Sequence, residues 1–135
     1  MHSTSTFSFL RRVLAFDALS SGALGLGALL FAPTLAGLLG LPGDLLREAG
    51  IVLLPFAAFV GFIASRSEQS RIGVWIVIAL NTLWVIDSVL LLFANGIEPN
   101  AVGYGFIIGQ AIAVGVLAQL EYVGLRRATR MVAAT

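Results

Sequence analysis

Four long apolar stretches constrain this chain more than any other feature. They cover residues 13–31, 49–65, 72–93 and 101–120. A helix needs about 20 residues to cross a hydrocarbon core of roughly 30 Å, and each stretch is close to that length. The sequence therefore predicts an all-α integral membrane protein, a four-helix bundle that forms one domain over residues 1–135.

Polar and turn-forming residues set the ends of the predicted helices. We expect helices over residues 10–32, 44–65, 72–94 and 100–123. Short connections between consecutive spans favour an up-down-up-down order with antiparallel neighbours. The segment 33–43 is apolar but interrupted by glycine and proline, so we expect it to lie along the membrane surface. Asp44 then follows a Pro-Gly turn and is the predicted N-cap of the second helix.

The composition agrees with a membrane location and excludes several kinds of chemistry. Hydrophobic residues make up 59% of the chain and charged residues 11%, against a charged share of roughly 25% in soluble domains. The chain has no cysteine, and its one histidine is His2. Thiol redox chemistry, thiolate metal sites and bis-histidine haem ligation are therefore excluded. We expect no metal, no cofactor and no nucleic-acid partner.

The arginines predict the orientation in the membrane. Seven of the eight basic residues fall at the chain ends or between the second and third spans, which places them on one side of an up-down bundle. These residues are Arg11, Arg12, Arg66, Arg71, Arg126, Arg127 and Arg130. Only Arg47 falls on the other side. By the positive-inside rule we expect a multi-pass inner-membrane protein with both termini in the cytoplasm.

Small residues at helical spacing are candidates for helix packing, because they let backbones approach closely inside a bilayer. The first helix offers Gly22 and Gly25, and the second offers Gly61. The fourth contains Gly105-Phe106-Ile107-Ile108-Gly109, a GxxxG motif continued by Ala113. Such faces either pack inside one bundle or join two chains. We expect the first for the GxxxG motif and keep a homodimer through the fourth helix as the alternative.

Ionisable residues at membrane depth are functional candidates by default. Asp17 shares one face of the first helix with Ser20 and Ser21, so a hydroxyl can satisfy its carboxyl. Arg12 is close enough in sequence to reach toward it. The spacing predicts a structural carboxyl, with a protonatable or cation-binding group as the alternative. Asp87 lies at a different depth in the third helix, and we expect it to form a separate site.

The third and fourth helices carry a second polar set. Asn81, Trp84 and Ser88 share a stripe of the third helix, with Asp87 at its margin. Gln110 on the fourth helix falls near the depth of Asn81, so we predict a hydrogen bond between these two amides. The alternative is a polar lining of a substrate cavity. Glu121, close to the cluster of arginines that follows the fourth span, is expected to be an interfacial charge.

The general plan resembles the small four-span bacterial inner-membrane proteins loosely called DoxX-like. The resemblance covers nearly the whole chain in length, span count and orientation, and it implies no activity. Because the residues contain no catalytic signature, we do not expect an enzyme. The sequence instead favours an accessory, assembly or interaction subunit, in contact with lipid and with either a second copy or another membrane protein.

A second, more limited resemblance is to the small multidrug resistance transporters. It rests on an acid in the first helix, tryptophans in the third and a GxxxG motif in the fourth. This resemblance implies a dimeric proton- or cation-coupled transporter in which Asp17 is the coupling carboxylate and Gly105 and Gly109 form the dimer contact. The chain departs from that family in its longer first loop and in its strong arginine asymmetry, which opposes dual-topology insertion.

Overall fold

In the computed structural model the chain is all-helical over the described residues, which are 2–134 for the backbone and 9–130 for the side chains. Five helices follow one another: α1 (His2–Leu30), α2 (Ala32–Leu39), α3 (Gly43–Ser65), α4 (Arg71–Leu91) and α5 (Ala101–Ala134). Four of them contain a segment long and apolar enough to cross a membrane. These segments are Phe9–Leu30, Gly43–Ser65, Arg71–Leu91 and Ala101–Arg130. The four predicted long apolar helices are therefore present.

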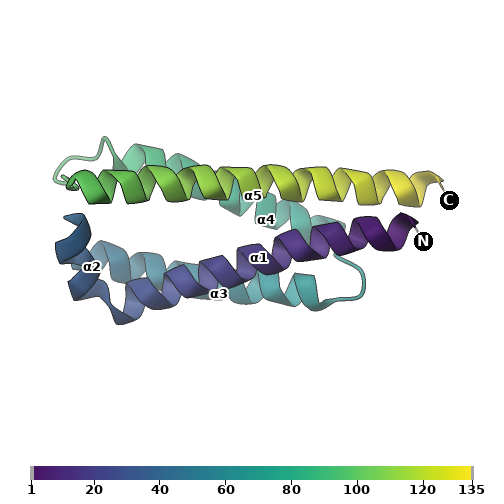
Figure 1. The fold of residues 1–135 in the computed structure, drawn as a ribbon, viewed down its shortest axis with the longest axis horizontal. Coiled ribbons are helices and arrows are strands. Elements are labelled where there is room, and N and C mark those ends of the chain that lie inside the picture. Colours follow the sequence, from purple (N-terminus) through teal and green to yellow (C-terminus); the bar gives the residue numbers. More distant parts are fainter. Residues whose placement is uncertain (1, 135) are drawn as a thin grey trace.

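The long helices form two closely packed pairs, α1 with α3 and α4 with α5 (Figure 1). The pairs are joined mainly where α1 packs against α5, whereas α3 and α4 contact each other little. The chain ends lie at the same end of the molecule as the connection between α3 and α4 (Figure 1). We call this the terminal end, and the end that carries α2 the α2 end.

Local capping explains where the helices begin and end. Ser70 precedes α4 and accepts a hydrogen bond from the Gly73 backbone nitrogen at 3.1 Å. Asn100 does the same for α5, accepting from Gly103 at 2.8 Å. The N-cap of α3 is Pro42, so the prediction that Asp44 caps this helix is wrong. Asp44 lies in the first turn instead, where its negative charge favours the positive end of the helix dipole.

The segment expected at the membrane surface contains the short helix α2. Its C-cap is Gly40, at a φ of 70°, a left-handed conformation that favours glycine. A side chain at Gly40 would also collide with the Asn100 backbone, 2.8 Å from the position of a Cβ atom. Asn100 donates to the carbonyls of Leu38 and Leu39, which fixes α2 against the start of α5.

Two apolar clusters fill the interior. The cluster toward the terminal end contains Leu10, Leu14, Val60, Ile63, Ala64, Val74, Val77 and Leu125. The cluster at the α2 end contains Ala32, Leu39, Leu41, Leu46 and Ile107. Most of the buried polar side chains lie in two groups, described below. The last helix extends beyond residue 123 because hydropathy marks the end of the apolar stretch and not the end of the helix.

Candidate functional site

Asp17 is the first member of a buried polar cluster between α1, α4 and α5. Its side chain is 1% exposed. Ser21, one turn later on the same face, donates to Asp17 Oδ1 at 3.1 Å. Ser20 bonds the Asp17 backbone carbonyl instead, at 3.1 Å. The predicted hydroxyl partner of the carboxyl is therefore Ser21.

Asn81 on α4 connects this carboxyl to a second one. Its Nδ2 donates to Asp17 Oδ2 at 2.7 Å and to Glu121 Oε1 on α5 at 2.9 Å. An amide nitrogen carries two hydrogens, so these two bonds use its full donor capacity. Three helices thus converge on one side chain. We call Asp17, Ser21, Asn81 and Glu121 the carboxyl cluster.

Glu121 is the member of the cluster that the sequence interpretation missed. Its side chain is fully buried, and Oε2 has no hydrogen-bond partner. The expectation of an interfacial charge is wrong. A sequence signal existed, because residue 121 falls on a seam with alternating spacings of four and three residues. That seam faces the bundle and contains Ile107, Ala111, Val114, Ala118, Glu121, Leu125 and Ala128.

The predicted bond between Asn81 and Gln110 is also wrong. Asn81 donates to Asp17 of α1 and to Glu121 of α5. Gln110 instead forms hydrogen bonds with Trp84 and Ser88 of α4. Matching depth is not sufficient for contact, because each amide must also face the other around its helix axis. Arg12 makes no ion pair with Asp17. Within the described side chains the single ion pair joins Arg47 to Asp44, at 2.9 Å.

Two carboxyl groups held by one amide at membrane depth constrain the charge of the cluster. If both were ionised, their negative charges would repel each other in a medium of low dielectric. A proton on either of the two carboxyl groups would remove that repulsion. The arrangement can therefore hold a proton as well as fasten three helices together.

A second polar network lies nearer the α2 end. Trp84 Nε1 donates to Gln110 Oε1 at 2.7 Å, and Gln110 Nε2 donates to Ser88 Oγ at 2.9 Å. Ser88 returns a bond to the Trp84 backbone carbonyl at 2.7 Å. Gln110 Nε2 also reaches the Ile107 carbonyl. Trp84, Ser88 and Gln110 thus satisfy one another's hydrogen-bonding groups and join α4 to α5.

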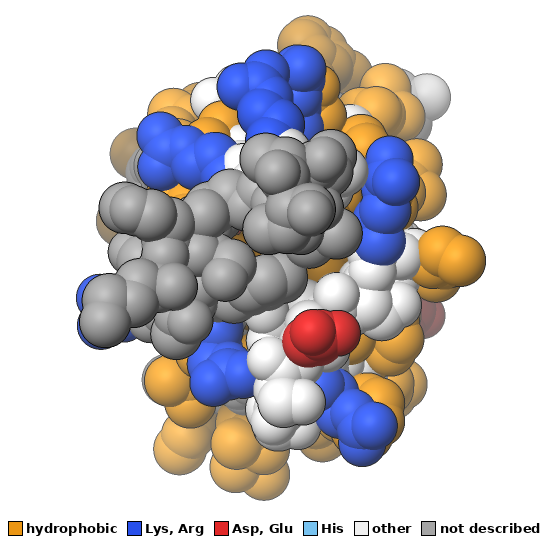
Figure 2. All heavy atoms as spheres, turned by 90° about the vertical axis from the view of Figure 1, so that its right-hand side faces the viewer, with side chains coloured by type: hydrophobic (Ala, Val, Ile, Leu, Met, Phe, Trp, Pro, Cys, Tyr) orange, Lys and Arg blue, Asp and Glu red, His pale blue; other side chains and the backbone are white. Residues whose placement is uncertain are grey.

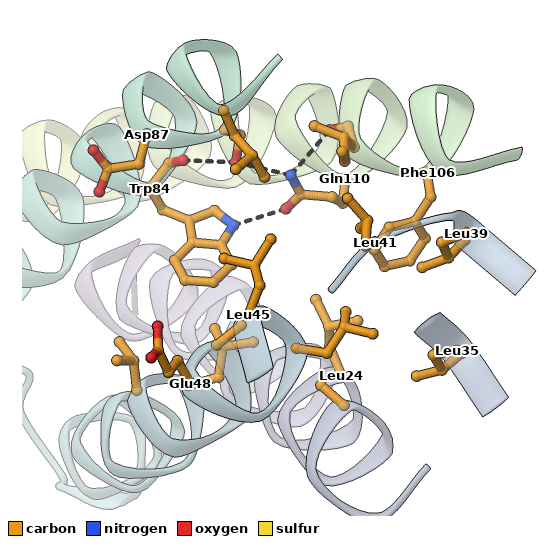
Figure 3. A pocket seen from close by; sticks show the side chains of 18 residues that line it. Leu24, Leu35, Leu39, Leu41, Leu45, Glu48, Trp84, Asp87, Phe106 and Gln110 are labelled. Carbon is orange, nitrogen blue, oxygen red and sulfur yellow. Dashed lines mark hydrogen bonds between the residues drawn. The ribbon is translucent and has the colours of Figure 1, made fainter. Parts of the chain in front are cut away.

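This network borders an apolar cavity of about 290 Å³ (Figure 3). Leucine is the most frequent residue in its wall, and Leu24, Leu35, Leu45 and Leu91 come from α1, α2, α3 and α4 in turn. The structure therefore favours the alternative of a cavity with a polar border over the simple amide clamp.

Two carboxylates also line this cavity, Glu48 from α3 and Asp87 from α4. Both side chains are exposed. They lie on the side of the cavity away from Leu35 and Leu39 of α2 (Figure 3). Asp87 takes no part in the carboxyl cluster. We call Glu48 and Asp87 the cavity carboxylates.

The predicted packing glycines divide into two groups. Gly22, Gly25 and Gly61 lie between α1 and α3, where a Cβ atom added at Gly25 would be 3.0 Å from Leu53 Cβ. Gly105 and Gly109 of the GxxxG motif have nothing within 4 Å of an added Cβ. They are exposed, as is Ala113. The expectation that this motif packs inside the bundle is therefore wrong, because α5 presents its other side to α1 and α4.

No family model, curated protein or solved structure matches this chain. The resemblances to DoxX-like proteins and to small multidrug resistance transporters therefore stay predictions. The function has to be argued from the site itself.

Proposed function

We propose that this chain is a non-enzymatic inner-membrane protein that acts as an accessory or interaction subunit, with an up-down-up-down bundle and both termini in the cytoplasm. The orientation is supported by charge. Arginine side chains gather at the terminal end (Figure 2). The α2 end instead carries Asp44, Glu48, Asp87 and Glu98 against the single Arg47. Arginine-rich ends stay in the cytoplasm during insertion.

Single-cysteine labelling tests this orientation, because the chain has no native cysteine. Glu68→Cys lies in the connection between α3 and α4, and Glu98→Cys lies in the connection before α5. In intact cells an impermeant maleimide is expected to label position 98 and not position 68. Labelling of position 68 alone would reverse the proposed orientation.

The observation that carries the interaction role is the outward face of α5. Gly105, Gly109, Ile112, Val116 and Gln119 follow spacings of four and three residues, and all five are exposed. This is the seam along which two helices pack, with small residues allowing close approach. Gln119 adds a second feature. Among the hydrogen bonds of the described side chains it has none, and an amide at membrane depth is stabilised by a partner on another helix.

The partner we assign to this seam is a second copy of the chain. Two parallel chains related by a twofold axis would place the same seam on both sides of the contact. Gly109→Cys is expected to give a disulfide-linked dimer on mild oxidation in membranes. Gly27→Cys on α1 is the matched control, since Gly27 also has open space around an added Cβ but lies off the seam.

Native mass spectrometry from nanodiscs supplies the second measurement. We expect a dimer for the wild type, a monomer for Gly109→Leu and a dimer for Gly27→Leu, because leucine at position 109 separates the backbones. A monomeric wild type without the cross-link at position 109 would refute self-association through α5.

The carboxyl cluster supports a second candidate function, a proton-coupled transporter. Asp17 and Glu121 share one amide donor and can hold one proton between them, as a coupling site requires. The test is pH-dependent uptake of a lipophilic cation into proteoliposomes. Transport in the wild type that is lost in Asp17→Asn but kept in Glu68→Gln would replace the accessory role. No transport in either the wild type or the variants would contradict the transporter.

A further inference from the structure

The cavity between the helix pairs has the character of a binding site for an alkyl chain. Its volume of about 290 Å³ is just below the range of roughly 300–1,000 Å³ that is typical of small-molecule sites. Trp84, Ser88 and Gln110 form hydrogen bonds with one another, so a ligand need not supply hydrogen-bond partners for them. Apart from Glu48 and Asp87, the remaining wall consists of leucine, alanine, valine, isoleucine and phenylalanine. A flexible hydrocarbon tail matches such a lining.

The cavity reaches the surface between α3 and α4. These two helices contact each other little. The cavity carboxylates come one from each, and both are exposed while lining the cavity. At the α2 end the wall is closed by α2, whose Leu35 and Leu39 face inward (Figure 3). A ligand would therefore enter the cavity laterally, from the lipid bilayer.

The cavity carboxylates specify the charge of the ligand. Neither forms an ion pair with a described residue, and the nearby Arg47 is bonded to Asp44. An acid within a membrane span normally pairs with another group or faces a cavity. Asp87 is such an acid, and two negative side chains at one opening attract a positive charge.

We propose that this cavity binds a cationic amphiphile, with the alkyl tail among the leucines and the positive head group between Glu48 and Asp87. This site is separate from the outward seam of α5, so it does not depend on the interaction role proposed above. Glu48 and Asp87 select the charge, and the apolar wall provides most of the binding free energy.

A matched pair of probes tests the proposal. Decyltrimethylammonium and decyl sulfate carry the same tail with opposite charges. The protein is held in zwitterionic nanodiscs, with protein-free discs correcting for partition into lipid. Trp75→Phe leaves Trp84, which lines the cavity, as the one fluorescent tryptophan. We expect a saturable change in the intensity or emission maximum of Trp84 on adding the cation, with a Kd at least about tenfold lower than for the anion.

Variants separate charge selection from tail binding. The double variant Glu48→Gln/Asp87→Asn should lose the preference for the cation, and each single variant should weaken it. Glu98→Gln, an acid at the same end that does not line the cavity, should keep it. Ala49→Phe and Val52→Phe, both on the cavity wall, should weaken both probes.

Three results would overturn the proposal. Equal binding of both probes to the wild type would show that the carboxylates do not select charge. A cation preference that survives in Glu48→Gln/Asp87→Asn would place the site elsewhere. No saturable binding of either probe would show that the cavity takes no alkyl chain.

Discussion

The two halves of the bundle use acidic residues in opposite ways. Near the terminal end, Asp17 and Glu121 are buried and both accept hydrogen bonds from Asn81. Near the α2 end, Glu48 and Asp87 are exposed, line an open cavity and have no ion pair with a described residue. A closed cluster of mutually bonded groups holds helices together, whereas unpaired charges beside an apolar cavity are available to a ligand. The same residue type therefore serves structure in one half and binding in the other.

The largest expected effect comes from removing the centre of the carboxyl cluster. Asn81→Leu removes the donor shared by Asp17 and Glu121 and leaves Glu121 with no donor at all, so we expect the free energy of unfolding to fall by about 3 kcal/mol or more. Thr82→Val, one residue along on an exposed position of α4, is the control and should change it by less than about 0.5 kcal/mol. Unfolding in mixed detergent micelles measures both. Equal stability of the two variants would show that the cluster does not hold the helices.

A clash between α1 and α3 should have the next largest effect. In Gly50→Ala the new Cβ atom would lie 2.7 Å from the Gly25 carbonyl oxygen, so the two helices must move apart. We expect a loss of about 1–3 kcal/mol in the free energy of unfolding. Gly27→Ala meets nothing within 4 Å and should gain up to about 1 kcal/mol from the higher helix propensity of alanine. The same unfolding assay would contradict the packing if Gly50→Ala were as stable as Gly27→Ala.

Neutralising one acid of the carboxyl cluster should cost little. Glu121→Gln keeps the shape and an acceptor for Asn81, and it leaves Asp17 as the single acid of the cluster, so no second negative charge has to be neutralised there. We expect a free energy of unfolding equal to or higher than that of the wild type. Asp17→Asn should behave similarly, and the double variant should gain less than the sum of the two single effects. Additive effects in this double-mutant cycle would show that the two carboxyls do not interact.

The smallest expected effect on stability is at the cavity carboxylates. Asp87→Asn and Glu48→Gln change exposed groups that have no described ion pair, so each should alter the free energy of unfolding by less than about 0.5 kcal/mol. A loss comparable to that of Asn81→Leu would mean that the two halves do not differ as argued.

The four long apolar helices could be predicted from the sequence, because a bilayer requires such helices and the hydropathy pattern shows them directly. It also identified Asp17, Asn81, Trp84, Ser88 and Gln110 as intramembrane polar groups. It predicted a hydroxyl partner for Asp17, which is Ser21, but it failed on the partners that lie on other helices. Residue spacing shows which side chains share a helix face, but not toward which neighbour that face is turned.

The rotation of α5 illustrates this limit. One face carries Gly105 and Gly109, and another carries Ile107, Ala111 and Glu121. Both have helical spacing, and both contain small residues. The small-residue rule favoured the glycine face as the buried one, yet the face with the glutamate packs against the bundle. Continuing the spacing of four and three residues along α5 through Ala118, Glu121 and Leu125 would have indicated that Glu121 is buried.

One thermal-unfolding experiment tests the central claim most directly, namely that the two halves use their acids differently. Midpoints are measured for the wild type, Asn81→Leu and Glu48→Gln/Asp87→Asn, each with and without decyltrimethylammonium. A ligand that binds the folded state raises the midpoint. We predict that Asn81→Leu has a lower midpoint but keeps the ligand-induced rise, whereas the cavity variant keeps the wild-type midpoint and shows a clearly smaller rise. The opposite pattern, a destabilised cavity variant with the full wild-type rise, would contradict the account.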